Sequence, residues 1–162
     1  MHRSAALIAA LVLLVGAFAT PAAANDRTIC DSRESTPDAA IAACTRLINS
    51  GKLKGRNLAP TYNNRGLNYN HKGEYDRAIL DLNEALRLDP GMASAYNNRG
   101  WSYNEKGEYD RGLDDLNHAL RLNPKMLHGY TNRAWSYFGK HDYDRAISDF
   151  SPNFPLSKTV RV

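Results

Sequence analysis

The sequence Tyr-Asn-Asn-Arg-Gly at residues 62–66 decides the fold, because it returns as Tyr-Asn-Asn-Arg-Gly at 96–100 and as Tyr-Thr-Asn-Arg-Ala at 130–134. Each copy begins 34 residues after the one before it, since 96 − 62 = 34 and 130 − 96 = 34. The block Ala-Leu-Arg-Leu-Asp-Pro at 85–90 returns with the same step as Ala-Leu-Arg-Leu-Asn-Pro at 119–124. A fixed period of this length indicates a stack of structural repeats.

Each period has the pattern of two amphipathic helices joined by a turn. In both halves, small and apolar residues return at intervals of three and four positions, which places them on one face of an α-helix. They are Tyr62, Gly66 and Tyr69 in the first half, with Arg65 beside them, and Ala78, Ile79, Leu82, Ala85 and Leu86 in the second. Gly73 and Gly107 are predicted to end the first helices, and Pro90 and Pro124 the second.

The step and these positions together resemble the tetratricopeptide repeat. The resemblance extends over residues 59–150, with a first repeat at 59–92, a second at 93–126 and an incomplete third at 127–150. It implies an all-α solenoid of helix–turn–helix units, wound as a right-handed superhelix. In this family the concave groove of the superhelix usually holds a peptide or a helix of a partner protein.

The first 24 residues differ from the rest of the chain and are predicted to be a signal peptide. A short basic start is followed by an uncharged run over residues 5–19, which Thr20-Pro21 interrupts. The three alanines at 22–24 then supply the small residues of a signal-peptidase site, so cleavage is expected after Ala24. An uncleaved N-terminal anchor is the alternative. The mature chain is therefore expected in the periplasm or outside the cell, without a membrane span.

Residues 25–58 are predicted to form a degenerate half-repeat that leads into the stack. Residues 37–49 have the pattern of a second helix, residues 26–34 that of a remnant of the first, and residues 51–57 that of a basic connector. Cys30 and Cys44 are expected to form a disulfide, because an even number of cysteines in an exported chain favours pairing. Two buried free thiols are the alternative. The whole arrangement is similar to exported tetratricopeptide proteins of alphaproteobacteria.

The C-terminal end departs from the repeat. His141 stands where the first two repeats have a helix-ending glycine, at a cost of about 1–2 kcal/mol if the backbone must be left-handed there. Pro152 and Pro155 then interrupt an irregular tail over residues 151–162. This tail is either a truncated or frame-altered end or a segment that folds back over the last repeat. The third repeat is therefore expected to be the least stable.

The family resemblance places the groove on the solvent-facing side of each first helix. The candidate partner-binding residues on that side carry amides or aromatic rings: Asn63, Asn64, Asn70, Asn97, Asn98, Trp101, Asn104, Asn132, Trp135 and Phe138. A row of amides offers donors and acceptors to the backbone of an extended peptide, and aromatic rings can anchor its side chains. The alternatives are packing between repeats for the tryptophans and a solvated surface with local capping for the asparagines.

Charged residues have two candidate roles. Some tetratricopeptide proteins clamp a C-terminal carboxylate with Lys and Arg, but the matching positions here are Asn63, Leu67, Asn98, His128 and Asn132, which disfavours that subclass. Three arginines, in contrast, recur in step with three aspartates: Arg65, Arg99 and Arg133 with Asp81, Asp115 and Asp149. We expect structural ion pairs where the helices meet, with an anion site as the alternative.

The sequence thus predicts a binding module for a protein or peptide, with no enzymatic role, metal or cofactor. No nucleophile, base and orienting acid are spaced as a local motif, and a glycine-rich phosphate loop is absent. The net charge of +4 comes from basic residues interleaved with acidic ones, which disfavours nucleic acid as a partner. A self-assembling structural protein that stacks through its last repeat, as a homo-oligomer, and an accessory subunit of an envelope enzyme are the alternatives.

Overall fold

The computed structural model of the protein describes residues 21–150, with side chains from Asn25 onward. This part of the chain forms eight α-helices and one short 3-10 helix: α1 (Pro21–Asp31), α2 (Pro37–Asn49), η1 (Gly55–Leu58), α3 (Ala59–His71), α4 (Tyr75–Leu88), α5 (Ala93–Glu105), α6 (Tyr109–Leu122), α7 (Leu127–Gly139) and α8 (Tyr143–Phe150). The predicted all-α fold is confirmed. The tail over 151–162 lies outside the described residues, as does most of the predicted signal peptide.

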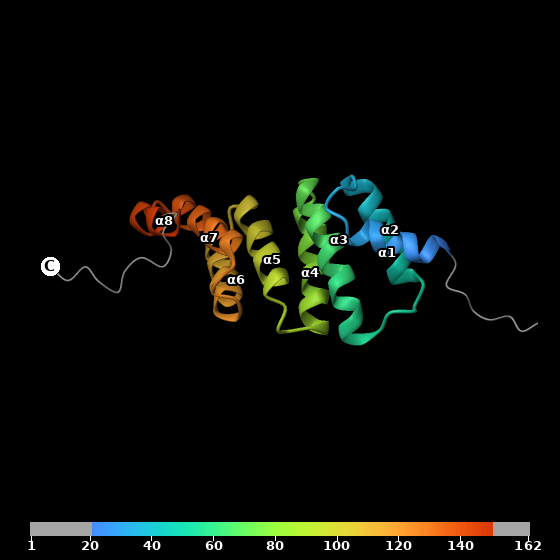
Figure 1. Ribbon diagram of the computed structural model, residues 1–162. Coiled ribbons are helices and arrows are strands. Elements are labelled where there is room, and N and C mark those ends of the chain that lie inside the picture. Colours follow the sequence, from blue (N-terminus) through green and yellow to red (C-terminus); the bar gives the residue numbers. More distant parts are fainter. Residues whose placement is uncertain (1–20, 151–162) are drawn as a thin grey trace, which may run out of the picture.

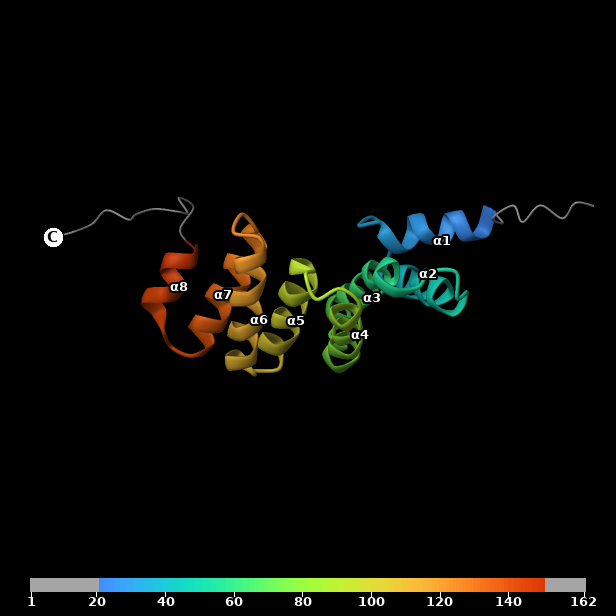
Figure 2. The ribbon, with the colours of Figure 1, turned by 90° about the horizontal axis from the view of Figure 1, so that it is seen from below.

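The helices form a single row of antiparallel pairs. Figure 1 shows α1 and α2 at one end of the row and α7 and α8 at the other, and Figure 2 shows the same order seen from below. Within the row, α3 packs against α4, α5 against α6 and α7 against α8, while α5 contacts both α3 and α7. The first helices therefore adjoin one another along one side, and the predicted helix–turn–helix solenoid is confirmed.

The helix ends follow the signals in the sequence. Gly73 and Gly107 have φ angles of 73° and 75°, and the N–H groups of Gly73 and Glu74 close the last turn of α3 on the carbonyls of Asn70 and Tyr69. A side chain disfavours this left-handed backbone, whereas glycine adopts it readily. His141 has the same conformation, with a φ of 61°, so the third repeat makes this turn without glycine.

Small residues let the two helices of a repeat approach closely. A Cβ atom built on Gly66 would lie 2.8 Å from Cγ of Leu82, and one on Gly100 would lie 2.7 Å from Cγ of Leu116. Leu82 and Leu116 are fully buried at these crossings. One core cluster surrounds Leu82 in the first repeat, and a second lies between α1 and α2 around Cys30 and Cys44.

An arginine joins three helices at each crossing. Arg65 donates from Nε and Nη2 to both oxygens of Asp81, at 2.7 and 2.8 Å, and Arg99–Asp115 and Arg133–Asp149 repeat this geometry. The remaining nitrogen, Nη1, donates to the second helix of the preceding unit, at Thr45, Asn83 or Asn117. The hydrogen bond to Asp81 raises the pKa of Arg65, against the opposing effect of burial. The prediction of structural ion pairs is confirmed.

The N-terminal cap, α1 and α2, is held by one covalent and one ionic link. Cys30 and Cys44, both buried, are joined by a disulfide, and their Cα atoms lie 5.0 Å apart. Arg46 on α2 forms a two-pronged ion pair with Asp26 on α1. Helix α2 begins as predicted, with the Thr36 side chain accepting from the N–H of Ala39. Because α1 also contacts α3, the cap is packed onto the first repeat.

Candidate functional site

A groove of about 920 Å³ runs along the side on which the first helices adjoin one another. Its walls come from the α1–α2 turn, from α3 and α5, and from the beginning of α7. The lining residues are Cys30, Asp31, Ser32, Arg33, Ser35, Pro37, Asn63, Asn64, Leu67, Asn68, His71, Ser94, Asn97, Asn98, Trp101, Met126, His128 and Asn132. The groove therefore spans the cap and parts of three repeats, and half of its lining residues are asparagines or serines.

Five asparagine side chains in the groove are linked in a row, which we call the amide ladder. Each amide nitrogen donates to the next side-chain oxygen, in the order Asn132, Asn97, Asn98, Asn63, Asn64 and finally Asp31. The five N···O distances lie between 2.9 and 3.2 Å. The ladder thus crosses from α7 through α5 and α3 to the cap without interruption.

The ladder fixes the orientation of its amides and leaves part of their capacity unused. An amide has two N–H donors and an oxygen with two lone pairs, and each ladder bond uses one N–H and one lone pair. Asn63, Asn97 and Asn98 are only 7–8% exposed, but all three line the groove. Fixed amides on a groove wall can bind a peptide backbone without first losing rotational freedom.

Two of the predicted groove residues lie between the repeats. Asn70 is 2% exposed, its nitrogen donates to the backbone oxygen of Asn98, and its oxygen accepts from Ser102. Asn104 makes the same bonds one repeat later, to the backbone oxygen of Asn132 and from Ser136. Asn70 and Asn104 therefore do not line the groove. Asn70 joins α3 to α5, and Asn104 joins α5 to α7.

The aromatic candidates are divided between two places. Trp101 lines the groove, where its ring meets His71 edge-on at a centroid distance of 5.3 Å and its Nε1 donates to Glu105. Trp135 and Phe138 lie at the C-terminal end of the row, in contact with each other and, for Trp135, with Phe150. Of the predicted aromatic residues, only Trp101 is in the groove.

The cap contributes a wall of the groove that the sequence did not indicate. Asp31, Ser32, Arg33, Ser35 and Pro37 line it from the α1–α2 turn. Asp31 also accepts the last bond of the ladder, at 2.9 Å from Asn64. No repeat signal pointed to these residues, because the spacing of the cap departs from the 34-residue step.

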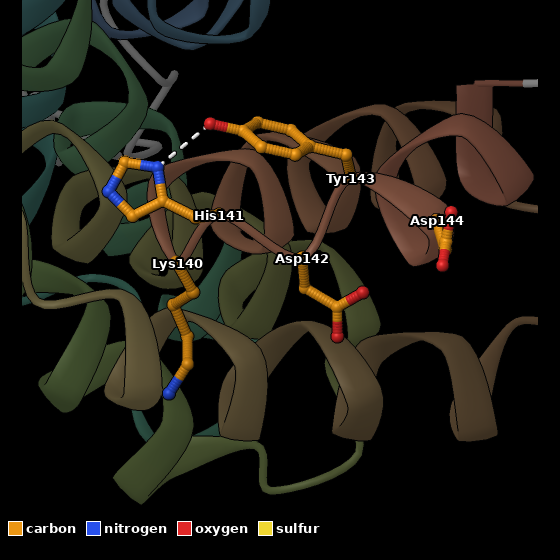
Figure 3. A pocket seen from close by; sticks show the side chains of 5 residues that line it. All are labelled: Lys140, His141, Asp142, Tyr143 and Asp144. Carbon is orange, nitrogen blue, oxygen red and sulfur yellow. Dashed lines mark hydrogen bonds between the residues drawn. The ribbon is translucent and has the colours of Figure 1, made fainter.

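A second, smaller hollow of about 400 Å³ lies at the α7–α8 turn and is lined by Lys140, His141, Asp142, Tyr143 and Asp144. Figure 3 shows His141 and Tyr143 pointing toward one another, and His141 Nδ1 lies 2.9 Å from the Tyr143 hydroxyl. Lys140 is already paired with Asp110 of α6. None of the five residues is buried, so the hollow has no desolvated charged group that could act as a recognition centre.

The described residues hold neither a metal site nor a membrane-spanning helix. Within residues 21–150, no group of three or more His, Cys, Asp or Glu side chains is arranged to hold a metal ion. None of the helices in that part of the chain has the length and apolar composition needed to cross a membrane.

Comparisons with known proteins agree with this architecture. The tetratricopeptide repeat model matches residues 59–92 and 93–126. No curated protein matches the chain. Among solved structures, a crystal structure of MamA has 24% identity and a TM-score of 0.60, over 70% of this chain and 64% of that chain. The Thermobaculum terrenum O-GlcNAc transferase has 26% identity and a TM-score of 0.63, over 74% of this chain and 23% of that chain.

A third solved structure is the first repeat domain of RPAP3 bound to an HSP90 peptide, with 26% identity and a TM-score of 0.50, over 59% of this chain and 82% of that chain. The chain spans less than two thirds of the length of the MamA and transferase chains. The repeat model, the helix pairs and these solved structures agree on one assignment. Residues 59–92 and 93–126 are therefore two repeats of the tetratricopeptide repeat family.

Proposed function

We propose that this protein is a non-enzymatic interaction module whose groove binds an extended segment of a partner protein. The observation that carries the proposal is the amide ladder, from Asn132 to Asp31. Backbone N–H and C=O groups are free to pair with such amides in an extended segment, whereas in a helix they are already bonded to one another. The ladder therefore favours an extended peptide over a helix in this groove.

The groove also has one apolar anchor point. Trp101 and Leu67 both line it and occupy equivalent positions of α5 and α3, one repeat apart. Large aromatic side chains contribute a disproportionate share of binding energy at such surfaces. We infer that an apolar side chain of the bound segment packs here while its backbone contacts the amides.

The charge of the groove distinguishes it from a carboxylate-binding groove. Asp31 and Arg33 are its charged lining residues apart from histidine, and neither Lys nor Arg comes from α3 or α5. Affinity that depends on amide and apolar contacts responds little to ionic strength. We therefore expect peptide binding to change little when the salt concentration is raised.

Two further observations support the proposal. The first repeat domain of RPAP3 has a similar fold, and its structure contains a bound HSP90 peptide. The Cys30–Cys44 disulfide supports an oxidising compartment, which is consistent with an exported adaptor or with an accessory subunit of an envelope enzyme. Both roles use the same groove, so identifying the partner distinguishes them.

The test uses two tryptophans at equivalent positions of successive repeats. Peptides are selected from a random display library on the intact protein, and their affinities are measured by fluorescence anisotropy for Trp101→Ala and Trp135→Ala. Trp101→Ala is expected to weaken binding by about tenfold or more, since it removes the aromatic anchor of the groove. Trp135→Ala is the matched control, because it removes the same side chain outside the groove.

Helical circular dichroism is recorded for both variants, so that loss of structure is separated from loss of binding. Equal affinities for the two variants would contradict the groove as the binding site. If Trp135→Ala alone changed the sedimentation of the protein, self-assembly through the exposed third repeat would replace peptide binding as the main function.

A further inference from the structure

The C-terminal end of the row exposes an unusually apolar surface, which we call the end face. It consists of Trp135 and Phe138 on α7 and Tyr143, Ile147 and Phe150 on α8. Their exposed fractions lie between 44% and 68%. The rings contact one another edge-on, with centroids 5.6–5.8 Å apart. Adjacent large apolar side chains left in water are typical of a surface that binds another protein.

The same face is covered in the preceding repeats. Leu116 is the equivalent of Phe150 and is fully buried. Tyr109 is the equivalent of Tyr143, and its ring packs so closely on α7 that a Cβ atom at Gly139 would overlap it. Leu116 packs against Gly100 of its own repeat, whereas Tyr109 is covered by α7, the first helix of the next repeat. In the same way, α5 packs on α4 and α7 packs on α6. The end face therefore has the shape of a surface on which the chain itself repeatedly packs a helix.

A column of aspartates shows what charge the covering helix carries. Asp38, Asp76 and Asp110 lie near the beginnings of α2, α4 and α6, and each pairs with a lysine at the end of the next first helix. The pairs are Lys72–Asp38 at 2.7 Å, Lys106–Asp76 at 2.6 Å and Lys140–Asp110. Asp144 occupies the same column on α8, is exposed, and has no such lysine among residues 21–150.

Two of these three helices, α5 and α7, also have a small residue at a fixed distance from the lysine, whereas α3 has Asn68 there. Ser102 lies four positions before Lys106, and Ser136 four positions before Lys140. Both serines are fully buried where the first helices meet. In the end face, Phe138 stands at the position of Asn70 and Asn104, so the surface facing this small residue is apolar.

We propose that the end face docks a helix of a partner protein that carries a small residue four positions before a lysine near its C-terminal end. The lysine would pair with Asp144, and the small residue would lie against Phe138. This is a second interaction surface, separate from the peptide groove. Charge complementarity at Asp144 and the packing at the two earlier junctions carry the proposal.

Two other occupants fit less well. In residues 151–162, two prolines lie within the first five positions, and the one lysine, Lys158, has Phe154 four positions before it. In a second copy of the chain, the helices with the required pattern, α5 and α7, already pack within their own row. A helix from another protein satisfies both the charge and the shape.

The probe is a synthetic peptide with the sequence of residues 93–106, the covering helix of the first repeat. It is titrated into the intact isotope-labelled protein, and backbone amide shifts are followed by NMR. Shifts confined to α7 and α8 are expected, together with a carbodiimide cross-link between the peptide lysine and Asp144. Asp144→Lys is expected to weaken the affinity for the peptide about fivefold, which is the upper range for an exposed ion pair. Asp114→Lys, on α6, is the matched control.

A charge exchange tests the assigned pair directly. The peptide with Lys106→Glu is expected to bind Asp144→Lys better than it binds the unchanged protein. No shift on α7 and α8 would overturn the proposal, as would shifts in the groove alone or an equal effect of Asp144→Lys and Asp114→Lys. A protein that is dimeric before peptide is added, and becomes monomeric in Ile147→Asp, would identify a second copy as the occupant and overturn it as well.

Discussion

Replacement of Arg99 by methionine should destabilise the protein far more than replacement of an exposed arginine. Arg99 donates to both oxygens of Asp115 at 2.7 Å and to Asn83 Oδ1 at 2.6 Å. The side chains of Arg99 and Asp115 are only 20% and 9% exposed. Methionine fills the volume of the arginine stem, but it leaves the carboxylate buried without a partner and removes the link between α4 and α5.

The magnitude follows from burial. Removing one partner of a buried ion pair costs about 3–5 kcal/mol. Since Arg99 retains some exposure, water can reach the carboxylate in the variant, and we expect a loss of about 3 kcal/mol in the free energy of unfolding. Arg87→Met is the control: Arg87 and Glu84 are 67% and 33% exposed, and such pairs contribute about 0.5 kcal/mol or less.

Urea unfolding followed by circular dichroism measures both variants. The double variant Arg99→Met/Asp115→Leu adds a second condition. It also removes the unpaired carboxylate, so it is expected to recover part of the lost free energy of unfolding. The reasoning would be refuted if Arg99→Met and Arg87→Met lost similar stability, or if the double variant were less stable than Arg99→Met alone.

Three further predictions concern the ends of the row. Cys30→Ser/Cys44→Ser should lose about 3 kcal/mol, the chain-entropy value for a loop closed at a sequence separation of 14. Amide hydrogen exchange should then rise more in α1 than in α5, and an equal rise in both helices would contradict a local stabilising role of the disulfide. His141→Gly should gain about 1 kcal/mol by calorimetry, because His141 has a left-handed backbone; a loss would show that its contact with Tyr143 outweighs the strain. The hydrogen bond from Arg46 lowers the pKa of Asp26 below its ordinary 3.8, so its contribution is complete above that pH and is lost as pH falls through the lower value. Asp26→Asn should remove this acid-dependent loosening of α1, measured by hydrogen exchange, and an unchanged profile would exclude the pair as its cause.

The repeated fold was predictable from the sequence because its determinants are local and periodic. The 34-residue step defines the helix pairs, and glycine and proline mark where helices end. The arginine–aspartate pairs were predictable for the same reason, since opposite charges that recur with one period repeat in every unit any contact that they make in one. The second helix of the cap, at residues 37–49, also followed from its apolar spacing.

The binding groove was only partly predictable. Spacing along one helix shows which side chains share its face, but not what the neighbouring helix places opposite them. Asn63 and Asn70 both belong to α3. The packing of α5 on α3 places Asn63 in the amide ladder, whereas Asn70 is buried with its nitrogen bonded to the backbone oxygen of Asn98. The cap wall at Asp31 was not anticipated, because residues outside the period carry no repeat signal.

Tertiary position also separates Trp101 from Trp135, which the sequence presents as equivalents. Trp101 has a repeat on either side and faces a groove, whereas Trp135 is in the last described repeat and stands 54% exposed at the end of the row. The sequence by itself determined the repeating unit, the helix ends and the arginine–aspartate ion pairs, because these depend on neighbours within one period. Only the stacked structure decided which amides and rings face a partner, because that depends on contacts between periods and with the cap.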